Sequence, residues 1–211
     1  MRRSLAVGAL AVALIGAGAS PAWAGGETDP GGGEWMPVEQ LVPEYYSPSD
    51  VDACGTTVTV SSGDVREVEA RQHLLPDGTL VTDFRGDATL DVTRHSDGAT
   101  IDELDISGPA REVVAPDGAS ADVALWGASL VYPLPGEEQF FAEAGLPDLA
   151  YYTDGKVVLH ITADPETGMT SSLTADVYAD VIDLCTWFDH DEGHDHDQCA
   201  DGKHDDHGHE H

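Results

Sequence analysis

The chain has 211 residues, and its 40 Asp or Glu against nine Lys or Arg give a net charge of −31 at pH 7. This charge excludes nucleic acids and anionic lipid surfaces as natural partners, because both are bound through clustered Lys and Arg. Metal ions, other cations and basic proteins remain as candidate partners.

The first 24 residues have the pattern of a cleaved signal peptide. Arg2 and Arg3 precede an apolar run from Leu5 to Ala17, and Ala22-Trp23-Ala24 supplies a small-x-small cleavage motif. The apolar run is shorter than the roughly 20 residues that span a bilayer. We therefore expect a secreted, extracellular protein with no membrane attachment after cleavage. Loss of the two arginines takes the net charge from −31 to about −33.

Residues 25–50 are rich in Gly and Pro and are predicted to form a flexible N-terminal segment. Within it, the more apolar stretch from Val38 to Tyr46 could either pack onto a domain or stay loose.

An antiparallel β domain is predicted for residues 51–188. In the first strand, Val58 and Val60 alternate with Thr57 and Thr59, which is typical of a half-buried strand. The expected strands are Thr56–Val60, Val65–Leu75, Thr79–Phe84, Ala88–Arg94, Thr100–Ile106, Arg111–Ala115, Ser120–Leu125, Ser129–Tyr132, Ala150–Thr153, Lys156–Thr162 and Met169–Leu184.

Tight turns separate these strands. The turn sequences combine Gly, Pro and Asp, and they are Ser62-Gly63-Asp64, Pro76-Asp77-Gly78, Ser96-Asp97-Gly98, Pro116-Asp117-Gly118 and Asp154-Gly155. One short helix is expected at Gly136–Ala144, where two Glu open the segment and Gly145 follows it. The fold class is therefore all-β: an antiparallel meander closing as a β-barrel or β-sandwich, with one short helix and disordered termini.

Residues 189–211 are predicted to be a disordered tail rich in His and Asp. Seven of the ten histidines lie between His190 and His211, among eight Asp or Glu. Neutral imidazole binds Zn, Cu, Ni and Co well, and carboxylates and thiolate extend the ligand set. The candidate metal ligands are His190, His194, His196, Cys199, His204, His207, His209 and His211.

Several ligand combinations are available in the tail. His194 and His196 are two apart, which places them on one side of an extended chain, whereas His190 and His194 are four apart, which suits a helix. The composition is similar to that of the His-rich loops of zinc-uptake proteins and zinc transporters. We expect loose binding of Zn, or of Cu, Ni or Co, with several ions per tail. Calcium is less favoured, because the Asp residues have no EF-hand spacing.

The three cysteines leave the disulfide pairing open. Outside the cell cysteines tend to pair, and Cys54 opens the first predicted strand while Cys185 closes the last. In an up-and-down barrel those strands are neighbours, so a Cys54–Cys185 bridge is favoured. A Cys185–Cys199 bridge is the main rival, and reduced or intermolecular states also remain. If Cys54 and Cys185 pair, Cys199 is an odd thiol and a metal ligand.

No enzyme signature is present: the chain lacks a G-x-S-x-G elbow, an H-E-x-x-H motif and a phosphate-binding glycine loop. We expect no catalytic role. His73, His95 and His160 could in principle form a cluster, but each is expected to decorate the surface.

The alternative function is a small-ligand-binding or protein-interaction β-barrel. Aromatic side chains could line its mouth, although we expect most of them to form the core. They are Trp126, Tyr132, Phe140, Phe141, Tyr151 and Tyr152.

Three stretches resemble those of uncharacterised secreted proteins of actinobacteria: CGTTVTVSSGDVREVE, DVTRHSDGATIDELDISGP and AGLPDLAYYTDGK. The resemblance covers most of residues 54–185. It implies a secreted β domain and no particular activity.

Overall fold

The computed structural model describes residues 33–164 and 167–188. Its strands are β1 (Met36–Pro37), β2 (Ser49–Ala53), β3 (Thr56–Arg66), β4 (Glu69–Leu74), β5 (Leu80–Arg85), β6 (Ala88–Arg94), β7 (Thr100–Asp105), β8 (Ala110–Val114), β9 (Ser120–Trp126), β10 (Ser129–Val131), β11 (Ala150–Tyr152), β12 (Lys156–Ala163), β13 (Thr170–Tyr178) and β14 (Ile182–Asp183). The helical elements are the 3-10 helix η1 (Val38–Gln40), α1 (Glu138–Glu143) and α2 (Cys185–Phe188).

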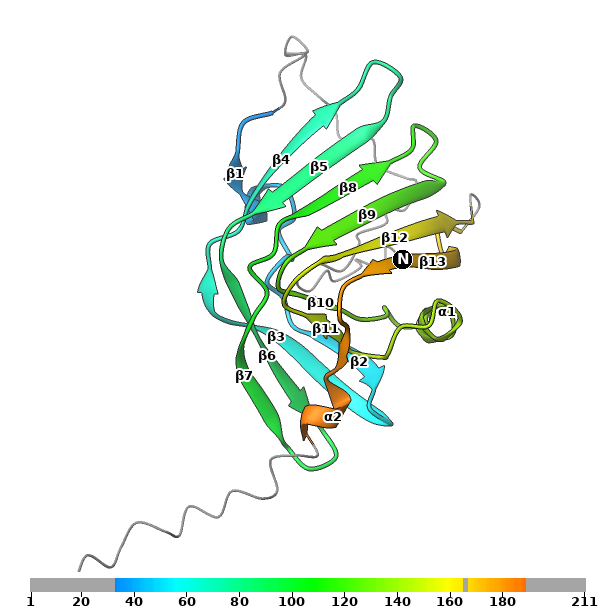
Figure 1. Ribbon diagram of the computed structural model, residues 1–211. Coiled ribbons are helices and arrows are strands. Elements are labelled where there is room, and N and C mark those ends of the chain that lie inside the picture. The colour runs from blue at the N-terminus through cyan, green and yellow to red at the C-terminus, as the bar shows by residue number, and fades with distance from the viewer. Residues whose placement is uncertain (1–32, 165–166, 189–211) are drawn as a thin grey trace, which may run out of the picture.

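The fold is all-β and antiparallel, as the alternating sequence predicts, and the described strands form three sheets. The largest has seven strands in the order β1-β4-β5-β8-β9-β12-β13, the second has the order β2-β3-β6-β7, and the third has the order β10-β11-β14. Figure 1 shows the seven-stranded sheet above the four-stranded one, with β10 and β11 beside them. Each described sheet has two edge strands, so the described strands form open sheets and not the closed barrel that we considered.

The chain passes between the two larger sheets four times, from β1 to β2, from β3 to β4, from β5 to β6 and from β7 to β8. The backbones come very close at two of these corners. A Cβ at Gly86, whose φ is +116°, would overlap the carbonyl oxygen of Glu67. A Cβ at Gly108 would overlap the carbonyl oxygen of Trp126. Glycine is therefore required at both corners.

Two adjoining hydrophobic clusters form the core. The first lies against the four-stranded sheet and contains Val58, Val60, Leu90 and Val92. The second lies between the seven-stranded sheet, β10–β11 and α1, and includes Val123, Leu159 and Phe141. Phe84 packs against both clusters and so joins them.

Residues 33–50 differ from the flexible segment that was predicted for residues 25–50. They contain β1, η1 and the start of β2. Val38 is fully buried and Tyr45 is 3% exposed, and both belong to the first cluster. The apolar stretch from Val38 to Tyr46 therefore packs onto the domain, which was one of the two alternatives.

The Ser62-Gly63-Asp64 sequence is not a turn but part of the long strand β3. The register between β3 and β6 shifts between Ser62 and Arg66, which indicates a β-bulge. The backbone N–H of Asp64 donates to the Glu103 carboxylate at 2.8 Å. A bulge and a tight turn favour the same residue types, so the sequence could not distinguish them.

The last predicted strand, Met169–Leu184, is two strands in different sheets. β13 ends at Tyr178, and β14 pairs with β11 in the three-stranded sheet. Ala179 and Val181 pack against the second cluster on either side of the bend. The apolar alternation therefore continues through the bend, because both side chains are partly buried against the second cluster. The predicted helix at Gly136–Ala144 is confirmed as α1, whereas η1 and α2 were not predicted.

An ion-pair ladder crosses the outer face of the seven-stranded sheet. Arg71, Asp83 and Arg111 lie opposite one another on β4, β5 and β8. Asp83 accepts from Arg71 at 3.0 Å and from Arg111 at 2.6 Å, and its side chain is only 9% exposed. Burial alone would raise the pKa of Asp83, but the hydrogen bonds from Arg111 and Arg71 outweigh it and lower the pKa.

The substitution Asp83→Asn should destabilise the domain, because it leaves both guanidinium groups without their carboxylate. We expect a loss of roughly 1–3 kcal/mol in denaturant unfolding at neutral pH. Because the pKa of Asp83 is lower in the folded state than in the unfolded state, its carboxylate stabilises the fold at pH values above its unfolded-state pKa. This contribution is lost as the pH falls through the pKa of the folded state. The difference in stability between this variant and wild type should therefore shrink below about pH 4.

The control is the substitution Asp102→Asn at an exposed residue on β7, and its stability should stay within about 0.5 kcal/mol of wild type. Equal stability of both variants would contradict the structural role of Asp83.

Candidate metal-binding tail and its anchor

All the predicted tail ligands lie outside the described residues, which end at Phe188. They are His190, His194, His196, Cys199, His204, His207, His209 and His211. Within residues 33–164 and 167–188, no group of three or more His, Cys, Asp or Glu side chains could hold a metal ion. The described residues that directly precede the tail are those of α2, Cys185–Phe188, and we call this segment the anchor. The structure therefore bears on the candidate site through the anchor.

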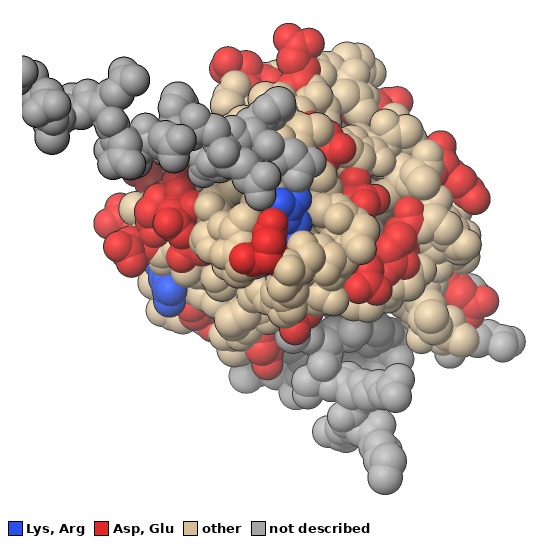
Figure 2. Space-filling model, turned by 90° about the horizontal axis from the view of Figure 1, so that it is seen from below, with Lys and Arg blue, Asp and Glu red and all other residues tan. Residues whose placement is uncertain are grey.

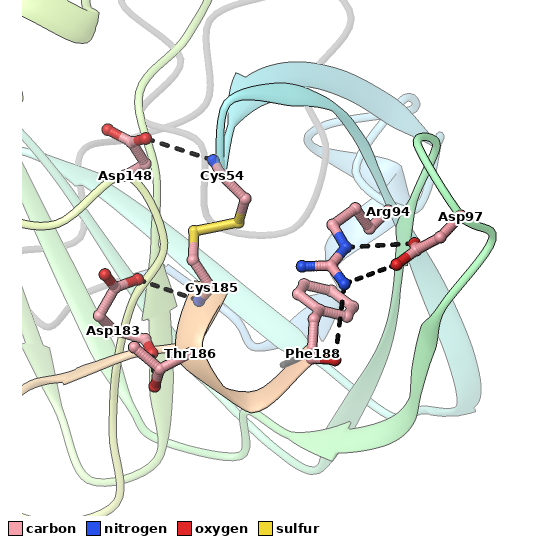
Figure 3. The surroundings of a disulfide bond; sticks show 8 residues. All are labelled: Cys54, Arg94, Asp97, Asp148, Asp183, Cys185, Thr186 and Phe188. Carbon is pink, nitrogen blue, oxygen red and sulfur yellow. Dashed lines mark hydrogen bonds and ion pairs between the residues drawn. A yellow bond between two sulfur atoms is a disulfide. The ribbon is translucent and has the colours of Figure 1, made fainter. Parts of the chain in front are cut away.

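A disulfide joins Cys54 to Cys185, which confirms the favoured pairing. Their Cα atoms are 5.2 Å apart and their sequence separation is 131 residues. Figure 3 shows the bridge at the base of α2. Cys199 is thus not a member of this pair.

The bridge has a different structural role from the predicted one. Cys54 lies in the β2–β3 turn, where Cys54 and Gly55 have φ values of 55° and 69°, as a type I′ turn requires. Cys185 begins α2, directly after β14. The disulfide therefore fastens the four-stranded sheet to the three-stranded sheet, and does not join the first and last strands of a barrel.

Polar contacts fix the backbone on both sides of the bridge. The N–H of Cys54 donates to the Asp148 carboxylate at 3.3 Å, and the N–H of Cys185 donates to the Asp183 carboxylate at 3.0 Å (Figure 3). The Thr186 hydroxyl donates to the Asp183 carbonyl at 2.7 Å. Asp183 therefore caps the first turn of α2.

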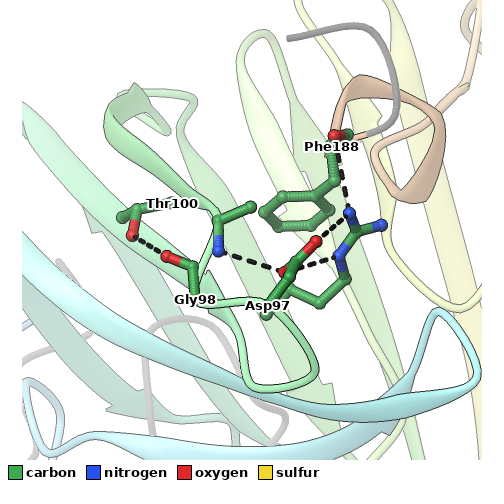
Figure 4. A network of polar contacts seen from close by, with 6 residues as sticks. Asp97, Gly98, Thr100 and Phe188 are labelled. Atoms are coloured by element: carbon green, nitrogen blue, oxygen red, sulfur yellow. Dashed lines mark hydrogen bonds and ion pairs between the residues drawn. The ribbon is translucent and has the colours of Figure 1, made fainter. Parts of the chain in front are cut away.

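Phe188, the last described residue, is held by the β6–β7 hairpin. Its side chain is buried, and the Arg94 guanidinium lies over its ring, 4.9 Å from the centroid. Arg94 also donates to the Phe188 carbonyl at 3.5 Å (Figure 4). The chain is thus fixed by packing, a cation–π contact and a hydrogen bond immediately before residue 189.

Asp97 holds Arg94 in place. Its two carboxylate oxygens accept from Arg94 at 3.1 and 2.6 Å, and one also accepts from the backbone N–H of Ala99 at 3.1 Å (Figure 4). The hydrogen bonds from Arg94 and then Ala99 lower the pKa of Asp97. The predicted Ser96-Asp97-Gly98 turn therefore has a second role, because it orients the arginine that binds the end of the domain.

Three aspartates, Asp97, Asp148 and Asp183, and one arginine, Arg94, lie around the disulfide and α2 (Figure 3). Seen from below, the molecule carries many Asp and Glu side chains and few Lys or Arg (Figure 2). Trp187, 38% exposed, packs edge-to-face on Tyr151 at a centroid distance of 5.7 Å. A cation that approaches this face of the described domain therefore meets a negative surface.

The three histidines of the described domain do not form a metal-binding cluster. His73 is half-buried on β4 of the seven-stranded sheet, whereas His95 follows β6 and its Nε2 lies 2.7 Å from the Thr59 hydroxyl. His160 lies on β12, and its ring contacts two carboxylates.

His160 is held between two aspartates that the sequence analysis did not connect with it. Its Nδ1 lies 2.7 Å from Asp122 on β9, and its Nε2 lies 3.4 Å from Asp176 on β13. The hydrogen bond to Asp122 is the main cause of the raised pKa of His160. Both ring nitrogens are engaged, so the protonated imidazolium is favoured over a metal-binding neutral ring. Strand pairing creates this trio, and residues 122, 160 and 176 show no signal at that spacing in the sequence.

The aromatic residues belong mainly to the core, as expected. Tyr132, Phe141, Tyr151 and Tyr152 are buried. Trp126 and Phe140 are partly buried.

No described helix is long and apolar enough to cross a bilayer. No family model, curated protein or solved structure matched this chain.

Removal of the bridge by Cys54→Ser with Cys185→Ser should cost about 2–5 kcal/mol of unfolding free energy, because the disulfide constrains a long loop in the unfolded chain. Denaturant unfolding of the variant and of wild type, each with and without a reductant, measures this. The reductant should affect wild type strongly and the variant little. A wild-type protein whose stability is insensitive to the reductant would contradict the prediction.

His160 should titrate above the ordinary histidine value of about 6.5, because both aspartates stabilise its protonated form. NMR of the ring protons measures the midpoint, and Asp122→Asn should lower it. Because the pKa of His160 is higher in the folded state than in the unfolded state, the imidazolium stabilises the fold at pH values below its unfolded-state pKa. This contribution is lost as the pH rises through the pKa of the folded state. A midpoint in wild type at or below about 6.5 would contradict the geometry.

Proposed function

We propose that this is a secreted protein that captures divalent transition metal ions, Zn²⁺ foremost, through residues 190–211. The observation that carries the proposal is the concentration of seven histidines, eight carboxylates and Cys199 in those 22 residues. Cu, Ni and Co are bound by the same nitrogen and sulfur donors, and Ca²⁺ is disfavoured because no calcium-loop spacing exists. The β domain has a carrier role without catalysis.

The chemistry of capture is coordination by neutral imidazoles. A Zn²⁺ site needs about four donors, and the tail offers more than that, so more than one ion can be held. The carboxylates raise the local concentration of cations before coordination. Because protons compete for the same nitrogens, bound metal is released as pH falls through about 6.5.

The anchor supports this proposal in two ways. The disulfide uses Cys54 and Cys185, so Cys199 is not consumed in that bridge and its thiolate can join the imidazoles as a ligand. The fixed position of Phe188 gives the tail a single point of departure beside an acidic surface.

The proposed extracellular location combines two observations. The first 24 residues have the pattern of a signal peptide, and the domain has a disulfide, which persists in oxidising compartments.

Zinc titration of the mature chain against a version that ends at Asp189 tests the proposal. The protein should be purified without a metal-affinity resin, and binding should be measured by calorimetry. We expect the truncated version to bind Zn²⁺ more weakly by roughly tenfold or more, because it retains no imidazole from the tail. Equal binding by the two proteins would overturn the proposal.

A matched variant separates coordination from simple charge attraction. Replacement of all seven tail histidines by Asn keeps every tail carboxylate, so an effect of charge alone would survive in it. We expect this variant to behave like the truncated version. Cys199→Ser in the full chain should weaken only the tightest Zn²⁺ site if the thiolate is a ligand.

A further inference from the structure

A carboxylate without a partner among the described residues lies on the inner face of the seven-stranded sheet. Glu112 on β8 lies opposite Thr82 on β5, which in turn lies opposite Gln72 on β4. Gln72 donates to the Thr82 hydroxyl at 3.1 Å, but Oε1 of Glu112 is buried and accepts no hydrogen bond from the described residues. Polar residues at these three positions interrupt a face that is otherwise apolar.

A buried acceptor without a partner is unfavourable by roughly 1–3 kcal/mol. The desolvation of Glu112 raises its pKa to about 7. Protein interiors seldom keep such a group unless a ligand, a bound ion or a reaction uses it.

The inner face beside Glu112 is apolar and is not sealed by the described core. Leu80 and Val114 lie one row further along the same face, opposite each other, and both are half-buried. Leu74, opposite Leu80, is 63% exposed. Among the described residues, these three side chains belong to neither hydrophobic cluster. This end of the sheet therefore presents hydrocarbon surface next to the carboxylate.

The other side of Glu112 is bounded by aromatic rings. Phe84 lies two residues from Thr82 on β5, and the Tyr45 ring stacks on it with centroids 6.3 Å apart. The Tyr45 hydroxyl is also buried without a hydrogen-bond partner among the described residues. We call the inner face of β4, β5 and β8 the apolar strip. Two buried polar atoms without a partner among the described residues, Oε1 of Glu112 and the Tyr45 hydroxyl, thus lie along it.

The charge of this strip selects the ligand. Alternation along the strands places Arg71 and Arg111 on the opposite face, where both pair with Asp83. The inner-face positions of β4, β5 and β8 carry no Lys or Arg, and Glu112 is their one ionisable side chain. A cation is therefore complementary to this strip, and an anion is not.

We propose that the inner face of β4, β5 and β8 binds a small apolar amine, whose ammonium group pairs with Glu112 and whose hydrocarbon body lies on Leu80 and Val114. The ion pair supplies the hydrogen-bond donor that Oε1 lacks, and burial of the hydrocarbon strengthens the pairing. The site is separate from the tail, so it would operate with or without bound metal.

Three probes of equal chain length test the site: octylamine, octanol and octanoate. Each should be titrated by calorimetry into the full mature chain at about pH 8, where Glu112 is ionised, in buffer that contains EDTA to exclude an effect of metal on the tail. We expect octylamine to bind most tightly, octanol more weakly because it offers one neutral donor, and octanoate least because it is repelled.

Two variants with the same change in charge separate the site from the general acidity of the surface. Glu112→Gln should weaken octylamine binding by roughly tenfold or more, whereas Glu143→Gln, on the exposed side of α1, should leave it unchanged. Equal binding of octylamine by the two variants and wild type would overturn the proposal. Failure of wild type to bind octylamine, or binding of octanoate as tight as that of octylamine, would also overturn it.

A measurement on wild type keeps the proposal testable if Glu112→Gln does not fold, which a thermal unfolding scan would reveal. Backbone amide NMR shifts induced by octylamine should concentrate at Thr82, Glu112 and Val114. Shifts confined to other parts of the domain would overturn the proposal.

Discussion

The fold depends on the close approach of backbones where the chain passes from one large sheet to the other. At Gly86 and Gly108 a side chain would overlap the carbonyl oxygen of a neighbouring segment, so the chain can turn at these two corners only because glycine has no Cβ. The interior contains two hydrophobic clusters, with Phe84 as a shared member. The three-stranded sheet contributes to both clusters, because Leu130 and Tyr151 belong to the first, and Val131 and Tyr152 belong to the second.

The few cations of the domain are used inside its own structure. Arg71 and Arg111 pair with Asp83, Arg85 pairs with Glu69, and Arg94 pairs with Asp97. Trp35 adds to this arrangement, because both Arg71 and Arg85 lie over its ring, at 4.6 and 4.0 Å from the centroid. A chain with so large an excess of carboxylates therefore uses its arginines to join strands and leaves its surface negative.

Local patterns predicted most of the strands, the helix α1 and the Cys54–Cys185 pair, because alternation, turn residues and cysteine number are local or countable signals. They did not predict features that depend on which strands become neighbours. The bulge at Gly63 was interpreted as a turn, and the bend between β13 and β14 was interpreted as continuous strand. The Asp122–His160–Asp176 trio and the buried Glu112 arise from pairing across three strands, so the sequence alone contained no spacing from which to infer them.

The tail differs from the domain in this respect, because its candidate chemistry is evident from composition and needs no fold. What the structure adds is the way in which the domain ends. The buried Phe188 and the bridge to Cys54 attach the final residues of the domain to its first hairpin and to the β6–β7 hairpin.

This attachment has a consequence for the order of events during the proposed export. In a chain that crosses a membrane from its N-terminus, Cys54 emerges 131 residues before its partner Cys185. Until then its thiol is exposed to oxidants and to other chains, and the β2–β3 hairpin has nothing to which it can be fastened. Cys199 follows only 14 residues after Cys185 in the sequence and emerges almost together with it. Correct oxidation therefore requires the domain to bring Cys54 and Cys185 together before Cys199 can compete, and the packing of Phe188 against Arg94 is one of the contacts that favour this outcome.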